Sequence, residues 1–165
     1  MSQEITTERL CLRMPLMSDA DDIVQAVNDI EVTRWLSQLP FPYTRKDAED
    51  FLSRQTSGKT FMICHNSKVI GCIGTVGEFG YWLSRAHWGQ GIMTEAADAV
   101  LAWHFAQSSD DLISGHALEN LRSRRVLLKM GFVDVEEVDR AHQITGELRR
   151  QQIMSLNAQD WQARS

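Results

Sequence analysis

Apolar and polar residues alternate in some stretches of this chain and recur every three or four positions in others. Alternation is typical of half-buried β-strands, and recurrence at the helical period is typical of amphipathic helices. The alternating or continuously apolar stretches predict about seven strands, at residues 8–14, 60–65, 69–76, 79–84, 112–118, 133–138 and 151–156. The stretches with helical period predict about four helices, at residues 19–28, 44–55, 92–107 and 121–130. Strands and helices are interleaved, which indicates an α/β or α+β class around one mixed sheet.

Capping signals support the limits of two predicted helices. Thr44, followed three residues later by Asp47, resembles a capping box. Asn120 can cap the helix at 121–130, and Gly131 stands where a glycine commonly ends a helix. No linker, repeat or low-complexity stretch interrupts the chain, so we expect one domain over residues 1–165.

Charge and composition exclude several classes of function. The formal net charge of -5 leaves no basic surplus to neutralise nucleic-acid phosphates, so nucleic-acid binding is not expected. No stretch resembles a signal peptide or a membrane-spanning helix, which predicts a cytoplasmic protein without membrane attachment. The three cysteines, Cys11, Cys64 and Cys72, lie among apolar neighbours without CxxC spacing. They therefore predict reduced, buried thiols, and no metal site is expected.

The turn Trp88-Gly89-Gln90-Gly91 joins a predicted strand to a predicted helix. A strand, a short glycine-containing turn and a helix N-terminus together present several backbone N–H groups to a phosphate. Glycine allows the backbone to approach an anion closely and to take positive φ. The turn is not a P-loop, because no Gly-Lys-Ser/Thr follows, and the third glycine of the dinucleotide fingerprint is missing. The turn thus predicts a ligand with a pyrophosphate but does not say which one.

Two segments carry the most specific pattern in the chain. The first is Gly80-Tyr81-Trp82-Leu83, followed by Trp88 to Ala96. The second comprises Asn120, Ser123, Leu127, Lys129, Gly131 and Phe132. Together they resemble the GNAT family of acetyl-CoA-dependent N-acetyltransferases, and most closely its RimJ/RimL-type branch of ribosomal-protein N-terminal acetyltransferases. Two further segments are similar to that branch, so the resemblance covers most of the chain: Thr7-Glu8-Arg9-Leu10 and Pro42-Tyr43-Thr44.

The resemblance implies a mostly antiparallel sheet splayed between its fourth and fifth strands, with acetyl-CoA in the gap. The exposed backbone of the fourth strand would bind the acetyl carbonyl and the pantetheine, through Tyr81, Trp82 and Leu83. The turn and the start of the following helix would hold the pyrophosphate, through Trp88, Gly89, Gln90, Gly91, Ile92, Met93 and Thr94. Met93 is bulkier than the Gly or Ala common in the wider family, and its side chain either crowds the turn or points into the core.

The departing CoA thiolate needs a proton donor. Many family members carry a tyrosine four residues before the glycine of the last Gly-Phe, where this chain has Leu127. The similar branch implies Ser123 instead, one helical turn after Asn120, so that both side chains can face the thioester. Alternatively, Ser123 is only a polar residue of the first helical turn, and Asn120 is only a helix cap.

The attacking amine must be neutral. An N-terminal α-amine, with a reference pKa of about 7.7–8.0, is roughly one-third neutral at pH 7.5, whereas a lysine amine is about 0.1% neutral. Glu78 is the leading general base because glutamates near this strand often serve so in the family, and its other interpretation is an exposed hairpin carboxylate. Trp35, Tyr43 and Trp82 are expected to wall the substrate pocket, although an aromatic residue at each position also suits the core.

The expected function is therefore transfer of an acetyl group from acetyl-CoA to a primary amine, by direct attack in a ternary complex. A peptide N-terminal α-amine is one candidate acceptor, and a polyamine or an antibiotic-like amine is another. A non-catalytic CoA-binding sensor and a nucleotide-binding regulatory domain are the alternatives of a different class. The sequence does not distinguish a monomer from a homodimer.

Overall fold

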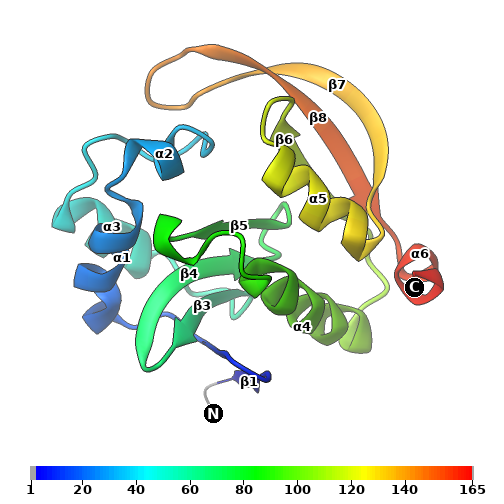
Figure 1. The fold of residues 1–165 in the computed structure, drawn as a ribbon, viewed down its shortest axis with the longest axis horizontal. Coiled ribbons are helices and arrows are strands. Elements are labelled where there is room, and N and C mark those ends of the chain that lie inside the picture. The colour runs from blue at the N-terminus through cyan, green and yellow to red at the C-terminus, as the bar shows by residue number, and fades with distance from the viewer. Residues whose placement is uncertain (1–2, 165) are drawn as a thin grey trace.

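The computed structural model describes residues 3–164 and arranges them in two antiparallel β-sheets with helices on their faces (Figure 1). The first sheet has five strands in the order β1 (Glu4–Thr6), β2 (Cys11–Arg13), β3 (Thr60–His65), β4 (Lys68–Gly74) and β5 (Gly80–Leu83). The second sheet has three strands in the order β6 (Leu112–Ala117), β8 (Leu148–Leu156) and β7 (Val133–Ala141). The expected limits 1–165 include positions 1, 2 and 165, which lie outside the described residues, and the single domain stays a prediction.

The two sheets separate between β5 and β6, which are the edge strands that face each other. They are joined at the base of the gap, where the Phe79 N–H donates to the Ile113 carbonyl at 2.8 Å. The Ser114 hydroxyl donates to the Phe79 carbonyl at 2.7 Å. This separation is the predicted splay, because residues 79–84 and 112–118 were the expected fourth and fifth strands. One sheet was expected and two are found, since main-chain hydrogen bonding between the strands on either side of the gap stops at Phe79.

Six α-helices occur in the described range, and they form layers on both sheets. They are α1 (Ala20–Val27), α2 (Ile30–Thr33), α3 (Arg45–Ser53), α4 (Ile92–Gln107), α5 (Leu121–Met130) and α6 (Ala158–Ala163). Successive side chains of a strand point to opposite faces of its sheet. On β3, Phe61 and Ile63 pack toward α4, whereas Met62 and Cys64 pack toward α1 and α3. The first sheet is therefore the middle of three layers, and its central strands β3 and β4 are buried on both faces.

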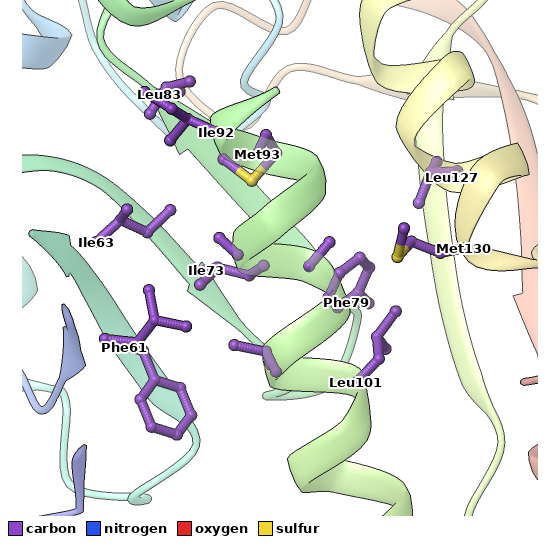
Figure 2. Packing of buried hydrophobic residues seen from close by; sticks show 14 of the residues in the cluster. Phe61, Ile63, Ile73, Phe79, Leu83, Ile92, Met93, Leu101, Leu127 and Met130 are labelled. Atoms are coloured by element: carbon purple, nitrogen blue, oxygen red, sulfur yellow. The ribbon is translucent and has the colours of Figure 1, made fainter. Parts of the chain in front are cut away.

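The helix α4 is the central element of the larger core. Its buried residues form one broad face of the helix, which lies between the first sheet and α5 (Figure 2). Side chains of α5, such as Leu127 and Met130, point toward Phe79 and Leu101 (Figure 2). Replacing a fully buried leucine such as Leu101 by alanine would cost about 2–5 kcal/mol, because a cavity would remain. The cleft wall formed by α4 is thus fixed by the core behind it.

Most predicted elements are present, and the departures have local causes. The predicted strand 8–14 is shortened to β2, because the Thr7 N–H donates to the Leu10 carbonyl at 2.9 Å and closes a turn between β1 and β2. The predicted helix 19–28 is α1, preceded by the 3₁₀ helix η1 (Met17–Asp19). The hairpin of β7 and β8 extends well beyond the predicted strand limits. Its outer residues are polar and mostly exposed, so no apolar alternation marks them.

Within residues 3–164, no helix is long and apolar enough to cross a membrane. The same range holds no group of three or more His, Cys, Asp or Glu side chains arranged to bind a metal ion.

Candidate functional site

A cleft of about 1020 Å³ opens between the two sheets. Residues from the first helices, the β5 edge, the glycine turn and α5 line it together. The predicted site residues that line it are Trp35, Tyr43, Glu78, Tyr81, Trp82, Leu83, Trp88, Gly89, Gly91, Ile92, Met93, Thr94, Asn120 and Ser123. Gln90 is not part of this lining, and its side-chain amide donates to the Ala86 carbonyl at 3.1 Å. The fold thus brings segments that are far apart in sequence to one cleft.

The glycine turn follows the 3₁₀ helix η2 (Arg85–His87) and leads directly into α4. Gly89 and Gly91 have φ of 72° and 76°, which favours glycine at both positions. The first N–H groups of an α-helix have no acceptor within the helix, and the helix dipole adds partial positive charge there. In α4, the first bond of the helical pattern is donated by the Glu95 N–H to the Gly91 carbonyl at 3.0 Å. The N–H groups between these residues are available to an anion in the cleft.

The strand β5 turns one backbone edge toward the cleft. In an antiparallel strand, the N–H and C=O of one residue point to the same side, and the sides alternate along the strand. The Ser84 N–H donates to the Ile70 carbonyl of β4 at 2.8 Å, so this residue faces the sheet. The Leu83 carbonyl accepts from the Trp88 indole Nε1 at 2.9 Å, so Leu83 faces away from β4. By alternation, Tyr81 also faces the cleft with its main chain.

The main chain of Trp82 faces β4 instead. Its carbonyl oxygen lies 2.7 Å from where a Cβ at position 71 would stand, so only Gly71 fits opposite it. The expected main-chain contact of Trp82 with the donor therefore falls to Tyr81 and Leu83. Trp82 reaches the cleft with its side chain.

Ser123 stands in the first turn of α5 and is linked across the gap to β5. The Tyr81 hydroxyl lies 2.8 Å from the Ser123 Oγ and 3.2 Å from the Ser123 carbonyl. Burial raises the pKa of the Tyr81 phenol above its ordinary value, and the hydrogen bond with Ser123 offsets only part of this increase. The Asn120 Oδ1 accepts from the Ser123 N–H at 3.4 Å, as expected for a helix cap. A neutral phenol thus holds the serine hydroxyl beside the cleft.

Glu78 lies just before β5, at the rim of the cleft. Both guanidinium nitrogens Nη1 and Nη2 of Arg140 donate to its carboxylate, at 3.2 and 2.7 Å. The Glu78 side chain is 44% exposed, so this pair is a partly solvated bridge from the first sheet to β7. The sequence indicated the carboxylate but not its partner, which comes from 62 positions further along the chain.

A family model for the acetyltransferase (GNAT) domain matches residues 9–133. The chain belongs to this family. The matched range contains the β5 edge, the glycine turn and the first turn of α5, all of which line the cleft. The predicted resemblance to the GNAT family is confirmed.

Relatives and solved structures agree with this assignment. The acetyltransferase is 29% identical over 147 residues to "Uncharacterized N-acetyltransferase p20" of Bacillus licheniformis, which covers 79% of this chain and 82% of the relative. It is 31% identical over 119 residues to the ribosomal-protein-serine acetyltransferase of Escherichia coli K12, covering 60% of this chain and 66% of the relative. Among solved structures, a GNAT-family acetyltransferase from Bacillus anthracis has a TM-score of 0.83 at 20% identity, with 94% of this chain and 98% of that chain covered.

A second similar structure is that of RimL, the ribosomal L7/L12 α-N-protein acetyltransferase, in complex with coenzyme A. Its TM-score is 0.78 at 18% identity, with 94% of this chain and 98% of that chain covered. At these identities the two structures establish the fold, which is a mixed α/β GNAT fold. Together with the Escherichia coli relative, they support the RimJ/RimL-like branch.

The end of the cleft beside the glycine turn contains a contact that the sequence did not indicate. The Arg122 guanidinium of α5 lies over the Trp88 indole, 3.6 Å from the ring centroid. The same indole donates to the Leu83 carbonyl, so Trp88 links the end of β5 to α5. A cation on an aromatic face contributes about 0.5–2 kcal/mol. The only sequence signal for this contact was an arginine next to Ser123, which a solvated helix face explains equally well.

At the other end of the cleft, near α2 and α3, the predicted aromatic residues differ in burial. Tyr43 is only 3% exposed and packs in the core between the first sheet and the α1 and α3 helices. Burial raises the pKa of Tyr43 to about 12, with a smaller contribution from the charge of Asp47. Trp35 is partly buried, and its Nε1 has no hydrogen-bond partner among residues 3–164. Tyr43 is therefore chiefly a core residue that touches the cleft, whereas Trp35 retains a free donor.

Two positions that were open in the sequence are decided by burial. Met93 is 8% exposed and its side chain belongs to the core cluster, so it does not crowd the turn (Figure 2). Leu127 is fully buried on the inner face of α5 and is not part of the cleft lining. A leucine side chain has no proton to donate, so this position supplies no proton donor.

Proposed function

We propose that this acetyltransferase transfers the acetyl group of acetyl-CoA to a protein N-terminal α-amine. The observation that carries the proposal is the Ser123 hydroxyl, held by Tyr81 across the cleft from the open edge of β5. The names of two similar proteins specify a ribosomal-protein serine and a ribosomal-protein α-amine as their substrates. These names support a protein α-amine as the acceptor.

The cleft fits acetyl-CoA in size and in the placement of its polar groups. Its volume of about 1020 Å³ is at the upper end for small-molecule sites. At one end, N–H groups of residues 88–94 would hold the pyrophosphate. In the middle, the main chain of Tyr81 and Leu83 would bind the carbonyls of the pantetheine and the acetyl group. Asn120 would contact the donor beside Ser123, because both side chains lie in the first turn of α5.

The proposed reaction is direct attack of the neutral amine on the thioester carbonyl within a ternary complex. The new N–C bond forms as the C–S bond breaks, and the thiolate leaves. The Leu83 N–H would stabilise the oxyanion, because it faces the cleft and is fixed by the adjoining β-sheet. Ser123 would protonate the thiolate, with Tyr81 holding its hydroxyl in place, and would regain its proton from solvent at the open cleft.

Glu78 is the proposed base that takes the proton of the amine. Two hydrogen bonds from Arg140 hold its carboxylate at the rim of the cleft. A weak base suffices for an α-amine, because a substantial fraction of such amines is already neutral near pH 7.5. A lysine amine is only about 0.1% neutral at that pH, so it depends much more on the base. The ordinary pKa values of the two amines therefore favour an α-amine as the acceptor.

The proposal is tested by CoA release with a panel of amines. The panel contains a lysine-free peptide with a free N-terminus, an N-acetylated peptide with one lysine, and spermidine. Release is followed with a thiol-reactive dye, and the product is identified by mass spectrometry. We expect the free N-terminal peptide to react at least tenfold faster than the other two. A faster rate with spermidine would contradict the proposed acceptor.

A small-molecule acceptor is the second candidate. A similar structure is that of the microcin C7 self-immunity acetyltransferase MccE with acetyl-CoA and AMP, with a TM-score of 0.75 at 18% identity. The sensor alternative predicts CoA binding without turnover for every amine in the panel. A regulatory nucleotide domain predicts that ATP or NAD, and not CoA, raises the melting temperature. The same preparation distinguishes all of these outcomes.

A further inference from the structure

The segment between β1 and β2 is fastened to the start of α4, immediately behind the glycine turn. The Arg9 Nη1 donates to the Gln90 carbonyl at 2.8 Å, and the Arg9 Nε donates to the Glu95 carboxylate at 2.8 Å. The Arg9 N–H and the Thr7 hydroxyl also donate to this carboxylate, at 2.9 and 2.5 Å. One arginine therefore connects the middle of the turn to the first turn of the helix. The two partners are more than 80 positions from Arg9 in sequence.

The contact with the Gln90 carbonyl determines the orientation of the next peptide group. In a trans peptide, the C=O and the following N–H point in opposite directions. Because the Gln90 carbonyl points to Arg9, the Gly91 N–H points away from Arg9, and Gly91 lines the cleft. The two glycines with positive φ would otherwise allow this peptide group many orientations. A fixed orientation reduces the entropy that an anion must remove on binding.

The contact with Glu95 concerns charge. Its carboxylate stands in the first turn of α4, where the pyrophosphate is proposed to bind, and an unpaired anion there would repel the ligand. Burial alone would raise the pKa of Glu95, but hydrogen bonds from Thr7 and Arg9 outweigh it and lower that pKa. Glu95 is therefore ionised and paired. Arg9 therefore neutralises the negative charge of Glu95, which would otherwise repel a pyrophosphate at the glycine turn.

We propose that Arg9 is a positioning residue for acetyl-CoA, holding the glycine turn in its anion-binding conformation from the side opposite the cleft. The proposal rests on the proposed binding of acetyl-CoA at this turn. Arg9 itself does not need to touch the ligand. Its effect is confined to the pyrophosphate, because the β5 edge and Ser123 are held by other contacts.

The test compares the wild type with Arg9→Met, Arg9→Lys and the double variant Arg9→Met/Glu95→Gln. The affinity for CoA is measured by isothermal titration, and rates are measured with acetyl-CoA and with acetyl-pantetheine, which lacks the pyrophosphate. The matched control is Asp98→Asn. Asp98 lies on α4, like Glu95, but its carboxylate forms an ion pair with Arg164 (2.7 Å), away from the glycine turn.

For Arg9→Met we expect about tenfold weaker CoA binding, because hydrogen bonds from a charged group are lost. The rate with saturating acetyl-CoA should stay within about twofold, and the rate with acetyl-pantetheine should not change. Arg9→Lys keeps the charge without the fork of donors, so we expect about threefold weaker binding. The double variant should still bind CoA about tenfold more weakly than the wild type, because its Gln90 carbonyl has also lost the hydrogen bond from Arg9. Asp98→Asn should bind CoA like the wild type.

Three results would overturn the proposal. Equal CoA affinity of Arg9→Met and wild type would show that the turn needs no support. Wild-type CoA affinity in the double variant would show that Arg9 acts only by neutralising the charge of Glu95, and not by holding the turn. An equal loss with acetyl-pantetheine would indicate general damage to the fold. Failure of the wild type to bind CoA would instead contradict the proposed function itself, and with it this inference.

Discussion

The proposed donor end of the cleft, where acetyl-CoA would bind at β5 and the glycine turn, is built from backbone groups. The proposed acceptor end, where the amine would bind beside α2 and α3, is built from side chains on loops. At the donor end, the glycine turn is held from behind by Arg9 and from the cleft side by the Trp88 contact with Leu83. At the acceptor end, the segment between α2 and α3 is irregular, and Trp35 keeps an unpaired Nε1 among the described residues. One donor needs one fixed backbone site, whereas acceptors are discriminated by side chains on variable loops.

The hairpin of β7 and β8 strengthens this difference. It arches toward α2 (Figure 1), and the Gln143 N–H donates to the Ser37 carbonyl at 2.8 Å. Near its tip, Ile144 is 59% exposed and Leu148 is 67% exposed. The acceptor end is therefore covered by an exposed hairpin that reaches it from the other sheet. Variants at the donor end should therefore change the KM for acetyl-CoA, and variants at the acceptor end should change the KM for the amine.

The largest effect is expected where the two ends meet. Ser123→Ala should lower kcat about 100-fold, because a positioned proton donor contributes at least that factor. The KM for acetyl-CoA should change by less than about twofold, since the backbone contacts remain. Initial rates over both substrates measure this, with Ser53→Ala on the exposed face of α3 as the control. An unchanged kcat would exclude Ser123 as the donor.

Next in size is the loss of the indole at the acceptor end. Trp35→Ala should raise the KM for the amine about tenfold and leave the KM for acetyl-CoA unchanged. Ile30→Ala is the matched control, because Ile30 is an exposed apolar residue of the neighbouring helix α2. If both KM values rise together, the two ends are not independent and the comparison fails.

Substitutions of Glu78 and Arg140, the ion pair at the rim of the cleft, should lower kcat/KM to different extents. Glu78→Gln should lower kcat/KM for the amine about fivefold at pH 7 and less at pH 9, where the amine is already neutral. Arg140→Gln should cost less than about twofold, because it leaves the carboxylate in place. A pH–rate profile of both variants measures this. Equal and pH-independent losses would mean that the pair only bridges the two sheets.

A smaller effect is expected for the cation over Trp88. Arg122→Ala should raise the KM for acetyl-CoA about threefold, because the contact and one positive charge near the turn are lost. The amine KM should not move. Lys129→Ala in the last turn of α5 removes the same charge far from the turn and serves as the control. The effect should shrink at high salt if it is electrostatic.

The smallest effect concerns stability. The pKa of Glu95 is lowered from an ordinary value of 4.5, so its stabilisation is complete above pH 4.5 and disappears as pH falls through the lowered pKa. Glu95→Gln should therefore lower Tm by about 2–4 °C at pH 7, for a loss of about 1 kcal/mol. The two Tm values should converge on acidification. A constant difference across pH would show that ionisation of Glu95 does not contribute.

The elements around the site were well predicted because their signals are local. The helix at 92–107, the helix at 121–130 and the strand at 60–65 have the predicted limits. The Thr44 cap with Asp47 is present, and Gly131 has φ of 99° at the end of α5. Caps and positive φ depend on a few neighbouring residues, so they can be identified without knowledge of the fold. The short helices α2 and α6 and the long β7–β8 hairpin have weaker local signals and were missed or shortened.

The sequence alone determined the class of fold and the GNAT resemblance, because periodicity and motif spacing are properties of neighbouring positions. It also predicted an anion-binding turn and a set of site residues. Only the tertiary structure decided which groups those residues meet. It paired Tyr81 with Ser123, Glu78 with Arg140 and Arg9 with Gln90, and it turned the main chain of Trp82 away from the cleft. Such pairs join segments 42 to 81 positions apart, whose approach depends on how sheets and helices pack.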